Sequence, residues 1–370
     1  MDDELYMERA LALAKKGAGR VNPNPLVGAV IVKDGRIIGE GYHQVYGGPH
    51  AEVNAFNSLT EESAGSTMYV TLEPCAHYGK TPPCVDGVIA GGVVRVVIAS
   101  LDPNPLVAGK SVKKMEESGI EVCVGVLKEA ADKLNEVFFH YITHKTPYVV
   151  MKYAMTADGK IATHTGKSRW ITGETAREKV HQDRNFYTGI MVGVGTVLAD
   201  DPMLDCRTGG RNPIRIICDT QLKTPKTARV VTTAHQQPTW LLTACLDEGR
   251  MAPYLEAGCQ IIQVKTKEGH LDLKSAMVIL GERGIDGILL EGGATLNASM
   301  LTAGLIQKVQ TYIAPKLFGG SLAPSPIGGA GIDEPDAAYQ LTDTTMTPLG
   351  DDICIESYVL KEQKPCLQES

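Results

Sequence analysis

Hydrophobic positions in the first 145 residues follow two periods. Met7 and Leu11 stand four apart in the stretch 5–16, which ends at Gly17, and this spacing predicts a short amphipathic helix. Apolar, β-branched runs predict strands at 26–32, 37–38, 68–72, 93–99 and 120–126. Asp34-Gly35 between the first two runs is typical of a hairpin turn. Helical stretches between these runs predict an α/β sandwich with a covered sheet and buried strands.

A second series of apolar runs begins after Lys145-Thr146-Pro147. We expect its strands at 148–154, 189–194, 214–218, 239–243, 260–264, 287–290, 309–314 and 353–360. Helical periodicity predicts helices at 174–183 and 294–301. Because 370 residues exceed what a single core usually organises, we expect two α/β domains. Their predicted bounds are 1–145 and 146–361, followed by a frayed tail at 362–370.

Composition and charge exclude several classes of protein. The formal net charge is −7 without long runs of one sign, which argues against general attraction to nucleic acid or to anionic membranes. No apolar run approaches the roughly 18 to 20 residues that span a bilayer. The N-terminal Met1-Asp2-Asp3-Glu4 is acidic where a signal peptide is basic. We therefore expect a cytoplasmic protein whose nine cysteines are reduced.

Three short segments carry the residues of a zinc site: His50-Ala51-Glu52, Pro74-Cys75, and Cys84 after Pro82-Pro83. One imidazole and two thiolates form a three-ligand zinc set, which leaves the fourth tetrahedral position open to water. We expect His50 and Glu52 in the first turn of one helix and Cys84 at the start of another. Glu52 is then the predicted catalytic acid–base, because it lies beside the metal without binding it.

Two other interpretations of these residues stay open at this level. An isolated His-x-Glu pair has little meaning, and an isolated buried cysteine is usually a small hydrophobic residue. A closed structural zinc site needs a fourth ligand, for which His77 is the nearest candidate, although it lies only two residues beyond Cys75. The order of the segments, at predicted strand–helix junctions, favours a catalytic metal over both.

These segments resemble the cytidine-deaminase superfamily, whose pattern is His-x-Glu followed by Pro-Cys-x-x-Cys. Here eight residues rather than two separate Cys75 from Cys84. With this insert, and with the segments 24–28 (NPLVG) and 102–109 (DPNPLVAG), the chain resembles a family of riboflavin-biosynthesis enzymes over essentially its whole length. The family is the bifunctional diaminohydroxyphosphoribosylaminopyrimidine deaminase and 5-amino-6-(5-phosphoribosylamino)uracil reductase. The resemblance implies a cytidine-deaminase-like three-layer α/β sandwich followed by a dihydrofolate-reductase-like α/β domain.

The insert can cover the deaminase pocket and supply polar groups to a substrate larger than a bare base, from His77, Lys80 and Thr81. Asn24 is expected to hydrogen-bond the ring or the ribose of that substrate. The alternative is that Asn24 belongs to an Asn-Pro turn without contact to substrate.

Glycine motifs in the second domain carry little information on their own. Gly193-Val194-Gly195 follows a predicted strand, but position 198 is Leu, so the dinucleotide fingerprint is incomplete. Gly292-Gly293 follows an apolar run and precedes a predicted helix, whose first N–H groups can hold a pyrophosphate. The same motif is equally typical of a tight strand–helix turn.

The segments 152–162, 168–172, 193–201 and 291–293 resemble the reductase domain of the same family. The resemblance implies that NADPH is bound by Ala154, Trp170, Thr196, Asp200, Gly293, Ala294, Thr295, Leu296, Asn297, Ala298 and Ser299. It implies substrate contacts from Lys152, Ser168, Arg184, Leu204, Arg207 and Glu291. An arginine pair can hold a ribose 5-phosphate, while Glu291 and Lys152 orient the ribose. Without the resemblance, Arg184 and Arg207 could be surface charges and Trp170 a core residue.

By this resemblance, the first domain deaminates 2,5-diamino-6-(5-phosphoribosylamino)pyrimidin-4-one hydrolytically with zinc, and the second reduces the ribosyl group of the uracil product to ribityl with NADPH. The expected partner is this small phosphorylated pyrimidine, with no nucleic acid and no membrane, in a homo-oligomer. A nucleic-acid adenosine deaminase is a rival interpretation, but it gives no reason for the second domain in an acidic chain. A binding protein with a relict site is another, and it would hold no zinc.

Overall fold

The computed structural model describes residues 3–76, 83–104 and 108–360. The chain divides into two compact units, Met1–Lys145 and Thr146–Ser370. The insert residues His77, Lys80 and Thr81 and the tail at 362–370 lie outside the described residues. Among the helices of the described ranges, none combines the length and the apolar character that crossing a bilayer requires.

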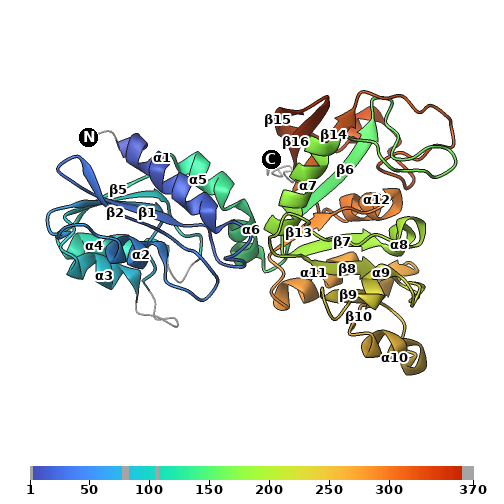
Figure 1. Ribbon diagram of the computed structural model, residues 1–370, viewed down its shortest axis with the longest axis horizontal. Coiled ribbons are helices and arrows are strands. Elements are labelled where there is room, and N and C mark those ends of the chain that lie inside the picture. Colours follow the sequence, from blue (N-terminus) through green and yellow to red (C-terminus); the bar gives the residue numbers. More distant parts are fainter. Residues whose placement is uncertain (1–2, 77–82, 105–107, 361–370) are drawn as a thin grey trace, which may run out of the picture. The chain divides into compact units, whose positions relative to one another are not determined.

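Five strands of unit 1 form one sheet in the order β2-β1-β3-β4-β5 (Figure 1). They are β1 (Gly28–Lys33), β2 (Arg36–Tyr42), β3 (Thr67–Leu72), β4 (Arg95–Ser100) and β5 (Glu121–Val124). β1 pairs antiparallel with β2 and β3, whereas β3, β4 and β5 run parallel. The predicted hairpin is confirmed: Asp34 and Gly35 join β1 to β2, and both have the positive φ that such a turn requires.

Helices cover both faces of this sheet. The helices of unit 1 are α1 (Asp3–Ala14), η1 (Lys15–Gly17), α2 (Ala51–Asn57), α3 (Cys84–Ala90), α4 (Lys110–Glu117), α5 (Lys128–Leu134) and α6 (Glu136–His144). Because neighbouring strand residues face opposite sides, Val30 packs in one core with α1 and α5, and Ile31 packs in another with α2, α3 and α4. The three layers are visible in Figure 1 and confirm the predicted sandwich.

The expectation of buried strands is wrong for β5. Glu121 and Val124 at its two ends are exposed, and the residues between them are only partly buried. The strand lies at the edge of the sheet and pairs with β4 alone. An edge strand has a neighbour on one side only, so solvent reaches side chains that the apolar pattern alone assigns to the core.

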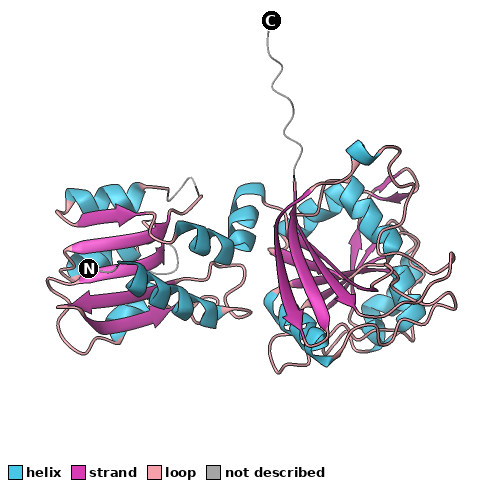
Figure 2. Cartoon of the chain, turned by 90° about the horizontal axis from the view of Figure 1, so that it is seen from above, coloured by secondary structure: helices cyan, strands magenta, loops and turns pink. Residues whose placement is uncertain are grey.

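Unit 2 is built on a nine-stranded sheet in the order β10-β9-β8-β7-β13-β6-β14-β16-β15, whose long strands appear in magenta in Figure 2. They are β6 (Tyr148–Thr156), β7 (Gly189–Gly193), β8 (Ile214–Cys218), β9 (Thr239–Thr243), β10 (Gln260–Gln263), β13 (Gly287–Leu290), β14 (Lys308–Ala314), β15 (Leu341–Leu349) and β16 (Asp352–Val359). The seven strands β10, β9, β8, β7, β13, β6 and β14 are parallel to one another. β16 pairs antiparallel with β14, and β15 pairs antiparallel with β16. A separate hairpin joins β11 (Thr266–Lys267) to β12 (His270–Leu271).

The connections of unit 2 are mostly helical, which gives the parallel part of the sheet its covering layers. The helices are α7 (Glu174–Phe186), α8 (Val194–Asp200), α9 (Arg229–Thr232), α10 (Glu248–Glu256), α11 (Leu273–Glu282), α12 (Ala294–Thr302) and η2 (Pro335–Ala337). Strand β7 ends one residue before its predicted end, because Val194 already begins α8. β15 and the β11–β12 hairpin were not predicted. Most side chains of β15 are exposed, so its sequence lacks the alternation of a half-buried strand.

Candidate metal centre and reductase cavity

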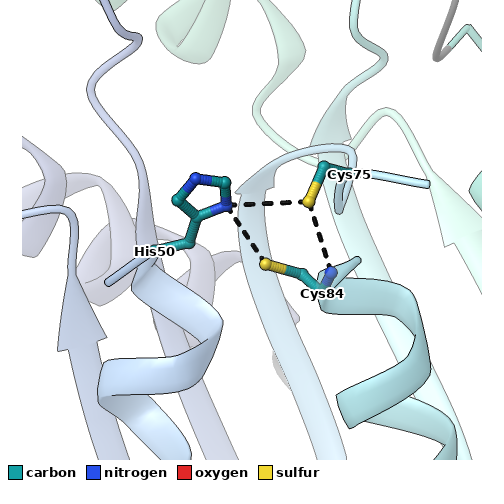
Figure 3. Close-up of side chains that lie close together, drawn as sticks. All are labelled: His50, Cys75 and Cys84. Carbon is teal, nitrogen blue, oxygen red and sulfur yellow. Dashed lines mark hydrogen bonds between the residues drawn. The ribbon is translucent and has the colours of Figure 1, made fainter. Parts of the chain in front are cut away.

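His50, Cys75 and Cys84 come together in unit 1 (Figure 3). His50 is the residue just before α2, Cys84 is the first residue of α3, and Cys75 follows β3. The ligand atoms of the three residues lie within 4.8 Å of one another. Nδ1 of His50 is 3.2 Å from Sγ of Cys84 and 3.6 Å from Sγ of Cys75. The prediction that His50 lies in the first helical turn is off by one residue, since the helix begins at Ala51.

The geometry of this cluster fits zinc. With bond lengths of about 2.3 Å to sulfur and 2.0–2.1 Å to nitrogen, a tetrahedral ion separates its nitrogen and sulfur ligands by about 3.6 Å. The two nitrogen–sulfur distances here, 3.2 and 3.6 Å, need little adjustment to receive such an ion. The backbone N–H of Cys84 also donates to Sγ of Cys75 at 3.2 Å, which orients that sulfur. A hydrogen bond from Cys84 lowers the pKa of the Cys75 thiol, which favours the thiolate that metals bind.

Glu52 is buried in the first turn of α2, two residues beyond His50, and is only 4% exposed. Burial raises the pKa of its carboxyl group. A carboxyl group with a raised pKa holds a proton more readily than an exposed carboxylate does, as a general acid requires. Its position beside the cluster therefore suits a proton carrier.

Asn24 is linked to the metal cluster by His43, a residue that was not predicted from the sequence: Asn24 contacts His43, and the His43 ring lies next to that of His50. Nδ2 of Asn24 is 3.1 Å from Nε2 of His43, and Nδ1 of His43 is 3.0 Å from the carbonyl oxygen of Pro49. The ring centroids of His43 and His50 are 5.6 Å apart. With Nδ1 protonated, His43 accepts from the Asn24 amide, so Oδ1 of Asn24 stays available to a ligand. The signal in the sequence was a histidine directly after the strand β2.

The motif at 102–109 is anchored by a second residue that sequence reasoning missed. Glu73 is 4% exposed, and its carboxylate accepts from the backbone N–H of Asp102 at 3.4 Å and of Gly109 at 3.0 Å. It also accepts from the hydroxyl of Ser111 at 2.6 Å. Glu73 therefore ties both described ends of this motif to the strand that leads to Cys75.

Unit 2 contains a cavity of about 1130 Å³ at the carboxyl ends of its parallel strands. The strands β7 and β13 are neighbours, and part of the wall is formed by Gly193, at the end of β7, and by Glu291-Gly292-Gly293, which follow β13. Ligands of open α/β sheets bind at this edge. Because pockets for one drug-sized ligand measure roughly 300 to 1,000 Å³, this volume suits a dinucleotide together with a second ligand.

Most residues predicted for the reductase site line this cavity. The predicted cofactor residues in its wall are Ala154, Trp170, Thr196, Asp200, Gly293, Ala294, Thr295, Leu296 and Ser299. The predicted substrate residues in its wall are Lys152, Ser168, Arg184, Leu204, Arg207 and Glu291. Asn297 and Ala298 are not among the lining residues: both side chains are buried, and Asn297 donates to the carbonyl oxygen of Pro326 at 3.0 Å.

A buried ion cluster occupies one wall of the cavity. Arg184 donates to both carboxylate oxygens of Glu291, from Nε at 2.8 Å and from Nη2 at 2.9 Å. Nζ of Lys152 lies 4.0 Å from the same carboxylate and 5.5 Å from the ring centroid of Tyr312. Burial by itself would raise the pKa of Glu291, but the charges of Arg184 and Lys152 hold it at about 2. The carboxylate is therefore ionised and fixed in direction.

The other predicted residues have distinct surroundings. The fork of Arg184 is directed at Glu291, so in the expected arginine pair only Arg207 presents a half-exposed guanidinium, which bonds Asp205 at 3.0 Å. Trp170 is 60% exposed and is not a core residue. The hydroxyl of Ser168 donates to the carboxylate of Asp200 at 3.1 Å, which joins a predicted substrate residue to a predicted cofactor residue. Other lining residues, among them Lys223 and His270, were not predicted.

Comparison with known proteins agrees with this arrangement. Residues 1–100 match the family model "Cytidine and deoxycytidylate deaminase zinc-binding region", and residues 147–355 match the "RibD C-terminal domain". Fold, site and these matches define a fused deaminase and reductase. The riboflavin biosynthesis protein RibD of Actinobacillus pleuropneumoniae is 50% identical over 361 residues, which cover 97% of this chain and 96% of the relative. The chain belongs to the RibD family.

Solved structures of the family match over the whole length. The structure of Acinetobacter baumannii RibD superposes with a TM-score of 0.87 at 35% identity, and covers 97% of this chain and 99% of that chain. A diaminohydroxyphosphoribosylaminopyrimidine deaminase/5-amino-6-(5-phosphoribosylamino)uracil reductase from Thermotoga maritima gives a TM-score of 0.85 at 39% identity, with the same coverage. The two-domain architecture of this chain is thus the architecture of its family.

Proposed function

We propose that this enzyme catalyses two consecutive reactions of riboflavin biosynthesis. Residues 1–145 remove ammonia from 2,5-diamino-6-(5-phosphoribosylamino)pyrimidin-4-one. Residues 146–361 then reduce the ribosyl group of 5-amino-6-(5-phosphoribosylamino)uracil to ribityl with NADPH. The observation that carries the proposal is the convergence of His50, Cys75 and Cys84 within 4.8 Å, beside the buried Glu52.

In the deamination, His50, Cys75 and Cys84 hold the zinc ion, and zinc when bound activates water for attack on a ring carbon. Glu52 takes a proton from the attacking water and delivers it to the departing amino group, so that ammonia leaves as a neutral molecule. Oδ1 of Asn24, kept available by the contact with His43, accepts a hydrogen bond from the ring or the ribose. Glu52 thus carries the proton, and Asn24 orients the substrate.

In the reduction, NADPH supplies the hydride, and the protein positions the ribose to receive it. Gly293 and the first residues of α12 line the cavity, and the N–H groups at such a helix start suit the pyrophosphate of the nucleotide. Glu291 and Lys152 hydrogen-bond the ribose hydroxyls, and Arg184 keeps Glu291 in place. Arg207, with a side chain that is 53% exposed, is the residue that reaches the 5-phosphate.

The free thiols, the net charge and an edge strand support a cytoplasmic location, a small-molecule substrate and a homo-oligomer. All eight cysteines in the described part of the chain are free, as in a reducing cytoplasm. The net charge of −7 fits a small-molecule substrate better than nucleic acid. Apolar side chains are exposed on the edge strand β15, at Leu341 and Met346, which suits pairing with a second copy in a homo-oligomer. Sedimentation of the enzyme, with Met346→Glu as the comparison, tests that assembly.

The decisive experiment incubates the zinc-loaded enzyme with the diaminopyrimidinone substrate and follows the products by mass spectrometry. Without NADPH, only the phosphoribosylamino uracil accumulates, together with one ammonia per substrate. With NADPH, the ribityl product replaces it. Reduction without prior deamination, or no release of ammonia from this substrate, contradicts the proposal.

A further inference from the structure

The segment 201–207, which leads from α8 toward β8, has an unusual backbone. It contains neither helix nor strand, and three of its seven residues have positive φ: Asp201 (39°), Leu204 (57°) and Arg207 (52°). Residues other than glycine rarely adopt this left-handed conformation, and it persists where the surrounding structure imposes it. Two of these three residues, Leu204 and Arg207, line the reductase cavity.

Side chains from elsewhere in unit 2 impose this conformation through the backbone carbonyl groups. Backbone groups of a segment without regular structure need other partners, and here four carbonyl oxygens of the segment accept side-chain hydrogen bonds, as does that of Asp200 at the end of α8. The bonds run from Arg169 to Asp200 (2.7 Å), Arg229 to Asp201 (2.7 Å), Arg215 to Met203 (3.4 Å), Gln237 to Leu204 (3.1 Å) and Arg184 to Asp205 (3.0 Å).

Two of these donors, Gln237 and Arg215, are buried and do not line the cavity. Gln237 is 4% exposed, and its Nε2 donates to the carbonyl oxygen of Leu204 and, at 2.8 Å, to that of Pro213. Arg215 is fully buried, and its Nη2 donates to the carbonyl oxygen of Gln237 at 2.6 Å. Neither side chain lines the cavity, yet both donate hydrogen bonds to the segment whose Leu204 and Arg207 do.

We propose that Gln237 is a positioning residue of the reductase substrate site and that Arg215 holds Gln237 in place. Gln237 fixes the Leu204 carbonyl and thereby the left-handed backbone that presents Leu204 and Arg207 to the phosphoribosyl pyrimidine. A segment fixed before binding loses less conformational freedom when the substrate binds, which appears as a lower KM. The inference rests on the proposed reduction in unit 2. It adds two residues that support substrate binding without lining the cavity.

The test is Gln237→Met in the full chain, because Met keeps the length of the side chain and removes the N–H donor. We expect the KM for 5-amino-6-(5-phosphoribosylamino)uracil to rise about tenfold, the effect of losing roughly one hydrogen bond's contribution. The Kd for NADPH, measured by fluorescence, stays unchanged and shows that unit 2 is folded. Ammonia release by unit 1 stays unchanged and serves as the internal control.

The matched control is Tyr254→Phe. It removes another buried hydrogen bond of unit 2, from the Tyr254 hydroxyl to the carbonyl oxygen of Thr224 at 2.5 Å, a bond that does not involve the segment 201–207. If Gln237→Met yields little folded protein, Gln237→Asn keeps the neutral amide, shortens its reach to the Leu204 carbonyl by one methylene group and takes the place of Gln237→Met in this test. An unchanged substrate KM in a variant that binds NADPH overturns the inference, as does an equal rise in Tyr254→Phe. Wild-type enzyme that fails to reduce the substrate refutes the proposed function instead.

Discussion

Arg184 and Glu291 form a two-pronged ion pair at 2.8 and 2.9 Å, although 107 positions separate them in the sequence. Each side chain is at most 14% exposed, so both charges are largely removed from bulk water. Paired buried charges of this kind are tolerated only with good geometry, and loss of one partner leaves the other uncompensated. The pair links α7 to the end of β13 and sets the direction of the carboxylate in the reductase cavity.

Breaking this pair is expected to destabilise unit 2 and to change its response to acid. Glu291→Gln leaves Arg184 buried without its counter-charge, which costs about 3–5 kcal/mol of unfolding free energy. In the wild type, the pKa of Glu291 falls from 4.5 to about 2 on folding. Its stabilising contribution is therefore complete above about pH 4.5 and is lost as the pH falls through about 2.

Urea unfolding at several pH values, followed by Trp240 and Trp170 fluorescence, measures this difference. The wild type is expected to lose stability between about pH 4.5 and 2 more steeply than Glu291→Gln. Glu282→Gln, at an exposed position of the same unit, is the control and keeps the wild-type slope. Parallel stability curves for wild type and Glu291→Gln would contradict a lowered pKa at this site.

Removing the carboxylate of Glu52 should stop deamination and leave the rest of the enzyme intact. Loss of a general acid–base group costs about 10² to 10⁴ in rate, so Glu52→Gln is expected to lower ammonia release by at least that factor. Zinc content by metal analysis and reduction of the uracil substrate by unit 2 stay at wild-type levels. Glu116→Gln, on the exposed surface of α4, is the control. Normal ammonia release by Glu52→Gln argues against the role given to this residue.

Cys75→Ser tests the metal site itself. A hydroxyl group is a poor replacement for a thiolate as a zinc ligand, so the variant is expected to purify with less than one zinc per chain and with little deaminase activity. Cys123, a free thiol in β5 of the same unit, gives the control variant Cys123→Ser, which keeps both. Treatment of wild type with a chelator has the same effect as Cys75→Ser, and reductase activity survives both. Full zinc content in Cys75→Ser would exclude Cys75 as a ligand.

Gly28 of the motif at 24–28 is required for close packing of α1 on β1. A Cβ atom at position 28 would lie 2.0 Å from the carbonyl oxygen of Ala10, a backbone atom that cannot move aside easily. Gly28→Ala is therefore expected to destabilise unit 1 by at least about 1–3 kcal/mol. Gly87 in α3 has open space for a Cβ atom, so Gly87→Ala is expected to raise the free energy of unfolding of unit 1 by about 0.5–1 kcal/mol. Thermal unfolding of both variants decides, and equal melting temperatures contradict the packing argument.

Much of the fold could be predicted because most strands are buried on both faces and read as continuous apolar runs. The runs at 214–218, 239–243 and 287–290 agree with β8, β9 and β13 residue for residue. The prediction failed where burial ends: β5 is partly exposed at an edge, and β15 is polar enough to lack any run. Pairing with the neighbouring strand determines the conformation of an edge strand more than its own residues do, so local hydrophobic patterns predict edge strands poorly.

The residues of the site divide in a similar way. The donor set His50, Cys75 and Cys84 was evident from residue type and spacing, because few side chains can bind zinc. His43, Glu73 and Gln237 were not, since each acts through a hydrogen bond to a backbone or amide group that any polar residue could make. The bond between Arg184 and Glu291 was not evident either, because Glu291 follows a strand far away in the sequence.

The amino-acid sequence alone determines the order of helices and strands, the chemistry of the metal ligands and membership in a family, since these depend on residue type and local spacing. Only the tertiary structure decides that three ligand atoms meet within 4.8 Å, that Arg184 turns toward Glu291, and that buried side chains hold the segment 201–207. The physical reason is that such contacts join residues far apart in the chain. Their geometry depends on how whole layers pack, and no local pattern records it.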